Sequence, residues 1–255
     1  SAKPMIRYGG KVMMTDLLGT VCNNLGDFII GAKYTSADLA YYTKGKQLPT
    51  LIKSNIYTSL ISVLFPGMSK INDEGEKVKA LSRKSIRVLT YIIYPLMTGL
   101  LVVAEPLTIF LYTEKWIAMV PFVWVVCIEA IFSVPGTITL QSVKAMGYSD
   151  KMLKAEIFKK PILILSIIIA MQYGVMAIAL TLPLNTLLEF VINGVMAHKT
   201  VDYSIREQLW DCLPATIMSV LMGAGVLLVA HLPLGLGTIA LLFVEILVGI
   251  VIYVL

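Results

Sequence analysis

The sequence predicts an all-α protein, a polytopic transmembrane helix bundle of about eight spans. Its 255 residues are 57% hydrophobic and only 15% charged, with a mean hydropathy of +0.81, whereas soluble domains carry about 25% charged residues. Apolar runs long enough to cross a bilayer recur along the chain, and charged residues gather between them. No basic face with interleaved aromatic residues is visible, so we expect no nucleic-acid partner.

Each span is assigned by length, at about 20 apolar residues. The expected spans are residues 11–32, 47–71, 88–111, 117–141, 161–172, 175–197, 213–231 and 237–255. The fifth span is short and lengthens if residues from 157 are counted. The segments expected between spans are a polar loop at 33–46, an interfacial amphipathic helix at 72–87, a charged segment at 147–160, a tight turn at 172–174 and a loop at 198–212.

The distribution of basic residues predicts the orientation. With the N-terminus inside, 16 of the 21 Lys and Arg residues fall on the cytoplasmic side. The positive-inside rule therefore favours a cytoplasmic location for both termini of this segment. The basic segments 77–87 and 151–160 could contact anionic lipid headgroups, or they could act only as a topology signal.

The first span carries a polar stripe that we interpret as part of a substrate or proton pathway. The stripe consists of Asp16, Thr20, Asn23, Asn24 and Asp27. At 3.6 residues per turn these positions share one helix face. An Asp facing lipid near the bilayer centre costs about 3 kcal/mol, so the stripe must face other helices or water. Helix–helix contact alone is the alternative, although five polar residues exceed what such contact needs.

Polar residues inside later spans are further candidates for the pathway. They are Lys53, Asn55, Glu129, Asn185, Glu189 and Asn193. The last three are spaced by four residues and share a face. Asp27 and Lys53 both lie about 8–9 Å below the outer boundary, which predicts a salt bridge or a shared site. The alternatives are that Lys53 snorkels to the outer surface and that the two glutamates are structural.

Motifs that indicate catalysis are absent from the sequence. It contains no GxSxG, HExxH, CxxC or phosphate-cradling glycine loop. Cys22, Cys127 and Cys212 lack metal-type spacing and are interpreted as apolar fillers of helices. We therefore expect a protein that is not an enzyme, with neither a cofactor nor a metal site.

Four motifs occur in order along nearly the whole chain. They are NNLGDFIIG followed by LAYY and LP, then VLFPGMSKI, AEPLTIFLYTEKWIAMVP and GYSDKMLKAEIFKK. Together they resemble the Wzx-type polysaccharide flippases of the MATE-like exporter superfamily. The resemblance implies a fold of two six-helix lobes, to which many members add two C-terminal helices. Residues 1–197 would be the second lobe and residues 198–255 the added pair, and the N-terminal lobe would be absent from this sequence.

The resemblance also implies a function. The substrate would be an oligosaccharide on a polyprenyl diphosphate, moved by ion-coupled alternating access across a bacterial inner membrane. Asp16, Asn23, Asn24 and Asp27 would suit the sugar and a coupling proton or Na⁺, while Lys53 would suit the diphosphate. The partners would be the lipid bilayer, the lipid-linked oligosaccharide and the missing lobe. The alternatives are a MATE-type efflux pump for small cations or drugs and a non-transporting scaffold of a polysaccharide-synthesis complex.

Overall fold

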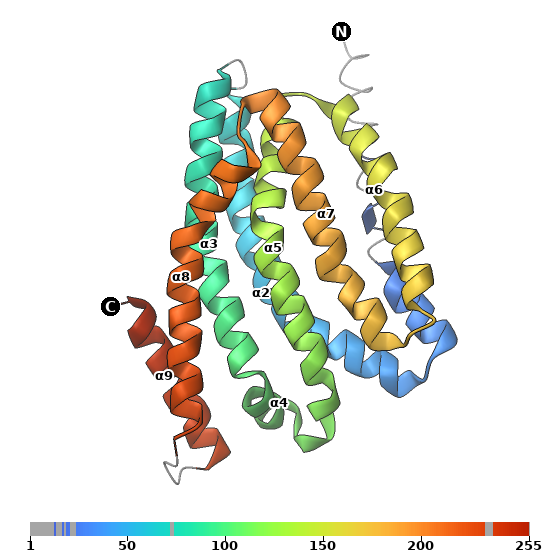
Figure 1. The fold of residues 1–255 in the computed structure, drawn as a ribbon, viewed down its shortest axis with the longest axis vertical. Helices are drawn as coiled ribbons and strands as arrows, with labels where there is room; N and C mark the ends of the chain where they lie inside the picture. The colour runs from blue at the N-terminus through green and yellow to red at the C-terminus, as the bar shows by residue number, and fades with distance from the viewer. Residues whose placement is uncertain are drawn as a thin grey trace.

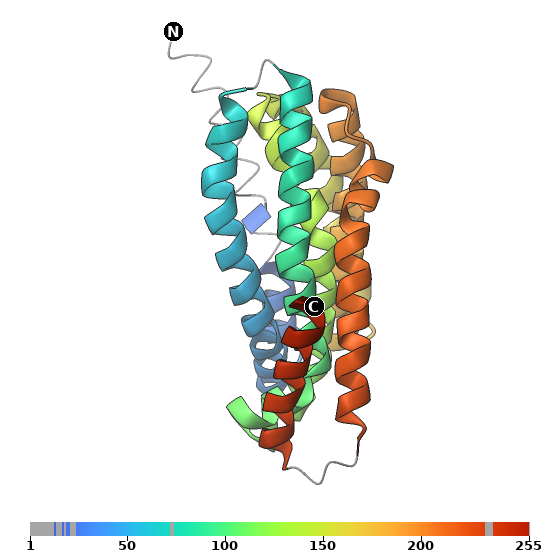
Figure 2. The ribbon, with the colours of Figure 1, turned by 90° about the vertical axis from the view of Figure 1, so that its left-hand side faces the viewer.

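In a computed structural model the chain forms a bundle of long helices (Figures 1 and 2). The structure describes residues 13, 17, 19–20, 24–71, 74–232 and 237–254. Within these ranges the regular elements are helices and none is a strand, which confirms the all-α prediction. After a first helical segment at residues 24–33, the elements are α2 (Ser36–Ser69), α3 (Gly75–Val102), α4 (Ala104–Tyr112), the 3₁₀ helix η1 (Glu114–Met119), α5 (Val120–Ala145), α6 (Ser149–Ala170), α7 (Val175–Val201), α8 (Ile205–Ala230) and α9 (Thr238–Val254).

Five helices among the described residues are long and apolar enough to cross a membrane: α2, α3, α5 together with η1, α7 and α8. The last helix, α9, is a shorter apolar helix of 17 residues. The first half of α6 is strongly charged. The structure thus describes a multi-pass membrane protein, and the number of eight spans stays a prediction.

Two segments predicted as loops are mostly helical, because capping residues start their helices early. Instead of a loop at 33–46, α2 begins at Ser36. The Thr35 hydroxyl accepts a hydrogen bond from the Asp38 N–H (3.1 Å), and the Asp38 carboxylate accepts one from the Thr35 N–H (3.1 Å). Instead of a loop at 198–212, only residues 202–204 are non-helical, and Ser204 with Glu207 caps α8 in the same way.

The charged segments at 72–87 and 147–160 do not form separate elements. From Gly75 the first is the beginning of α3, and from Ser149 the second is the beginning of α6, so an interfacial helix at 72–87 is a wrong prediction. Some of their charges are paired within the bundle. Arg83 and Arg87 of the first segment pair with Asp211, and Glu156 of the second pairs with Lys159 and Lys160. The tight turn at 172–174 is present, with Gly174 at a φ of 108°.

The third predicted span, 88–111, divides at Val103 into α3 and α4. Pro106 has no N–H and cannot donate to the carbonyl of Val102, so the helical hydrogen-bond ladder is interrupted there. Pro106 instead occupies the first turn of α4, where the missing N–H costs little.

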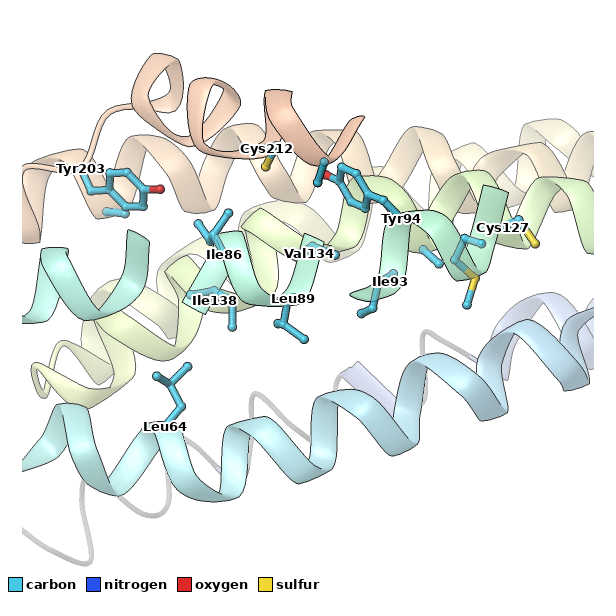
Figure 3. Packing of buried hydrophobic residues seen from close by; sticks show 14 of the residues in the cluster. Leu64, Ile86, Leu89, Ile93, Tyr94, Cys127, Val134, Ile138, Tyr203 and Cys212 are labelled. Atoms are coloured by element: carbon cyan, nitrogen blue, oxygen red, sulfur yellow. The ribbon is translucent and has the colours of Figure 1, made fainter. Parts of the chain in front are cut away.

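The main hydrophobic core lies around α3 and α5. Figure 3 shows Ile86, Leu89 and Ile93 of α3 close to Val134 and Ile138 of α5. All five side chains are fully buried. Cys127 and Cys212 are free thiols buried in the same cluster, as expected of apolar fillers. Helices α6 and α7 lie on one side of α5, whereas α8 and α9 lie on the other (Figure 1).

Close contact between α2 and α5 requires a glycine. A Cβ atom on Gly45 would lie 2.7 Å from Phe122 Cβ and 2.8 Å from the Met119 carbonyl oxygen. Small residues allow helix backbones to approach in this way. Gly67, on the same helix, has much more room, with its nearest neighbour Leu81 at 3.8 Å.

We expect Gly45→Ala to lower the free energy of unfolding by about 1–3 kcal/mol, because the added methyl group overpacks the α2–α5 contact. The matched control Gly67→Ala meets no such contact and gains helix propensity, so it should be neutral or stabilising by up to about 1 kcal/mol. Thermal unfolding of the detergent-solubilised protein measures both. A Gly45→Ala protein as stable as the wild type would contradict the close approach.

Candidate functional site

A polar cavity of about 440 Å³ opens between the first helical segment, α2, α5, α6 and α7. Six of the eleven predicted pathway residues line it: Asn24, Asp27, Lys53, Glu129, Asn185 and Glu189. They come from four different parts of the chain, and the fold brings them together. Tyr42, Lys46, Thr50, Thr181 and Thr186 add further polar groups to the lining.

Of the remaining predicted residues, Thr20, Asn55 and Asn193 are not part of the lining. Asp16 and Asn23 lie outside the described residues. The carbonyl of Thr20 accepts a hydrogen bond from Asn24 Nδ2 (2.8 Å). Asn55 is exposed on α2, and Asn193 is buried elsewhere between helices. The predicted stripe is thus represented in the cavity by Asn24 and Asp27.

Two lysines of α2 form ion pairs across the cavity. Lys46 Nζ lies 2.8 Å from Asp27 Oδ1, and Lys53 Nζ lies 2.6 Å from Glu129 Oε2. Lys46 and Lys53 are seven residues apart, which is two helical turns, so both point from the same face of α2. The first lysine meets the first helical segment and the second meets α5.

The predicted salt bridge between Asp27 and Lys53 is therefore wrong, although both residues line the same cavity. The sequence places Lys46 in an outer loop, because residues 33–46 are expected to be non-helical. Since α2 begins at Ser36, Lys46 is inside the helix and is the lysine that reaches Asp27.

Glu129 connects three helices. One carboxylate oxygen accepts from Lys53 of α2, and the other accepts from the Thr186 hydroxyl of α7 (3.2 Å). Next to Thr186 on α7, Asn185 Nδ2 donates to the Ser166 hydroxyl of α6 (3.0 Å). The Glu129 carboxylate thus accepts a hydrogen bond at each of its two oxygens. The hydrogen bond to α6 fixes the orientation of the Asn185 side chain.

A buried charge cluster on α6 was missed by the sequence reasoning. The side chains of Glu156, Lys159 and Lys160 are all less than 10% exposed. Glu156 forms ion pairs with both lysines. Lys160 Nζ also lies 3.7 Å from Oε1 of Glu189, which lines the cavity. The spacing of three and four residues was the available signal, because it places the three charges on one helix face.

Asn193 holds this cluster in place. Lys159 Nζ donates to its Oδ1 (3.4 Å), and its Nδ2 donates to the Gly136 carbonyl of α5 (3.2 Å). Asn193 therefore joins α5, α6 and α7 without lining the cavity. This is the helix–helix role that was the alternative interpretation for polar residues in spans.

Chemically, the cavity offers ammonium groups, carboxylates, amides and hydroxyls on a wall otherwise formed by apolar helices. Such a lining can donate hydrogen bonds to a polyhydroxylated ligand and accept them from it. Its lysines can bind phosphate oxygens when these displace the carboxylates. The site and the fold together define a multi-pass helical membrane protein with a charged cavity inside one bundle.

A solved structure shows the same fold. The chain is similar to the lipid II flippase MurJ in an inward closed conformation, with a TM-score of 0.77 and 18% sequence identity. The likeness covers 94% of this chain and 50% of the MurJ chain.

Sequence comparisons add relatives from polysaccharide biosynthesis. Residues 1–121 match a family model described as "Polysaccharide biosynthesis protein". The chain is 24% identical over 198 residues to lipopolysaccharide biosynthesis protein WzxC of Escherichia coli K12, covering 78% of this chain and 40% of WzxC. It is also 24% identical over 132 residues to teichuronic acid biosynthesis protein TuaB of Bacillus subtilis 168, covering 52% of this chain and 27% of TuaB. The resemblance to Wzx-type flippases is thereby confirmed, and this chain spans less than half the length of these curated relatives.

A double-mutant cycle tests the ion pair between α2 and α5. Lys53→Met should lower the free energy of unfolding by about 1–3 kcal/mol, because it leaves the partly buried Glu129 carboxylate without its cation. The double variant Lys53→Met/Glu129→Leu should recover most of that loss. Thermal or denaturant unfolding in detergent measures the coupling.

The exposed pair Lys77–Glu74 is the matched control, since both side chains are more than half exposed. Lys77→Met should change stability by less than about 1 kcal/mol. Strictly additive losses at Lys53 and Glu129 would show that the two residues are not coupled.

Proposed function

We propose that the protein containing this chain moves a polyprenyl-diphosphate-linked oligosaccharide across the bacterial inner membrane during polysaccharide biosynthesis. The observation that carries the proposal is the cavity, in which two lysines face a space lined by amides and hydroxyls. The similarity to polysaccharide biosynthesis proteins and the flippase-like fold support the same conclusion. The protein acts as a transporter and not as an enzyme.

The residues divide by the chemistry of the substrate. Lys46 and Lys53 bind the diphosphate, because they are the cations among the described residues that line the cavity. Asn24, Thr50 and Thr186 bind the sugar hydroxyls, because their amides and hydroxyls can both donate and accept. An apolar polyprenyl chain stays in the bilayer, where transfer to water would be unfavourable.

Ion coupling follows from the paired charges. When the diphosphate binds Lys46 and Lys53, Asp27 and Glu129 lose the cations that neutralise them. Two unpaired carboxylates in a partly buried cavity are costly. A proton or Na⁺ that binds these carboxylates removes the cost, so that substrate and coupling ion enter the same cavity together or in exchange.

We place residues 1–197 in one transporter lobe and residues 198–255 in an added helix pair, with both termini of the segment in the cytoplasm. In support, α8 and α9 pack on the α3 side of the bundle and contribute no residue to the cavity (Figure 1). The second wall of the transport pathway comes from an N-terminal lobe that faces this cavity.

In the full-length protein, Lys53→Met/Glu129→Leu should reduce surface polysaccharide at least about tenfold, because it removes a phosphate-binding cation and its carboxylate at little cost in stability. Polysaccharide is measured on cells in which the variant replaces the wild type, with protein abundance measured in parallel. Lys77→Met/Glu74→Leu, which removes an exposed pair outside the cavity, should leave polysaccharide normal.

Normal surface polysaccharide in the cavity variant would contradict the proposed function and would favour a scaffold role. A change in drug accumulation together with normal polysaccharide would favour an efflux pump.

A further inference from the structure

Away from the cavity, one buried carboxylate of α8 holds two arginines of α3. Arg83 donates from Nε and Nη2 to Asp211 (2.8 and 3.0 Å), and Arg87 donates from Nε and Nη2 to the same carboxylate (2.9 and 2.6 Å). The Asp211 side chain is only 1% exposed. Burial raises the pKa of Tyr203, so its hydroxyl stays protonated and also donates to Asp211 (2.8 Å). Asp211 thus fixes the orientation of both guanidinium groups.

These arginines keep unused donors on the outside of the bundle. A guanidinium has five N–H groups, and Asp211 takes two from each arginine. The side chain of Arg83 is 37% exposed and that of Arg87 is 55% exposed. Lys84 is exposed beside them and has no ion pair or hydrogen bond among the described residues. Two of these three cations therefore share the Asp211 carboxylate, and Lys84 has no such partner among the described residues.

The same surface has an apolar end. Arg83, Lys84 and Arg87 line an open pocket of about 670 Å³ together with Val88, Tyr91 and Ile92. Because successive members are four residues apart, Arg83, Arg87 and Tyr91 form one row along α3, and Lys84, Val88 and Ile92 form the adjacent row. Val88, Tyr91 and Ile92 are each about 40% exposed.

The position along α3 matches the edge of a bilayer. No Asp, Glu, Lys or Arg occurs between Val88 and Val102, so Arg87 is the last charged residue before the apolar part of the helix. The cations therefore lie at the level of lipid headgroups, and the apolar end lies at the level of acyl chains. By the distribution of basic residues this end of α3 is cytoplasmic, where anionic lipids bind basic pockets on transmembrane helices.

We propose that this surface of α3 is a binding site for one anionic phospholipid of the bilayer, with its phosphate on Arg83, Lys84 and Arg87 and its acyl chains along Val88, Tyr91 and Ile92. The site shares no residue with the polar cavity and does not depend on the proposed transport function. Fixed guanidinium groups lose little freedom when they bind phosphate, which favours a specific site over a diffuse basic surface.

The test compares lipids that differ only in headgroup. The full-length protein is purified in detergent, equilibrated with equal amounts of phosphatidylglycerol and phosphatidylcholine of the same acyl chains, and analysed by native mass spectrometry. The wild type should retain phosphatidylglycerol in preference. Lys84→Gln should lower that preference about fivefold, since each basic residue at the surface contributes about that much. Its unfolding temperature should not change, because Lys84 has no ion pair to lose.

Lys77→Gln is the matched control, because Lys77 is an exposed lysine of the same helix outside the pocket and should keep the wild-type preference. Equal retention of both lipids by the wild type, or an unchanged preference in Lys84→Gln, would overturn the proposal. So would displacement of phosphatidylglycerol by inorganic phosphate, which would show that the acyl chains play no part. Displacement by a lipid-linked oligosaccharide would overturn it as well, by assigning the surface to the transported lipid.

Discussion

The pairing of two α2 lysines with carboxylates from two other helices is the interaction on which the rest of the structure depends. A lysine or a carboxylate inside a membrane protein is costly unless it is paired. Lys46 can pair with Asp27 and Lys53 with Glu129 only if α2 lies against both the first helical segment and α5. The close approach at Gly45 and the hydrogen bond between the Tyr57 and Ser133 hydroxyls (2.8 Å) keep α2 in that register. The cavity is the space that remains between these helices.

The same pairing connects the structure with the proposed transport function. Partly buried ion pairs are costly to break, so a ligand that takes one partner must be accompanied by an ion that neutralises the other. Under the proposed function, an anionic headgroup and a coupling cation satisfy this requirement together. The helix contacts that involve Glu129, Thr186 and Lys160–Glu189 connect the cavity to α6 and α7. A change in charge inside the cavity therefore alters contacts of α5, α6 and α7.

Much of the fold could be predicted from the sequence, because composition and apolar runs determine that the chain is a helical membrane bundle. Polar residues inside spans also indicated the cavity, since burying them without partners is costly. The pairing could not be predicted, because it depends on where α2 begins, and the Thr35 capping box places that start well before the apolar run. Lys159 and Lys160 resembled a topology signal, and only packing against Glu156 and Asn193 shows that they are buried. The break between α3 and α4 at Val103 likewise follows from the missing N–H of Pro106 within an apolar run.

The central claim is that the paired lysines face a water-accessible cavity that receives the substrate. The most direct measurement uses Thr50→Cys, which adds a thiol on the cavity wall one turn from each lysine, in a full-length protein with Cys22 replaced by serine. The account predicts that a water-soluble thiol reagent modifies this cysteine and that bound lipid-linked oligosaccharide slows the modification. A cysteine that never reacts, or that reacts at the same rate with and without the substrate, would contradict it.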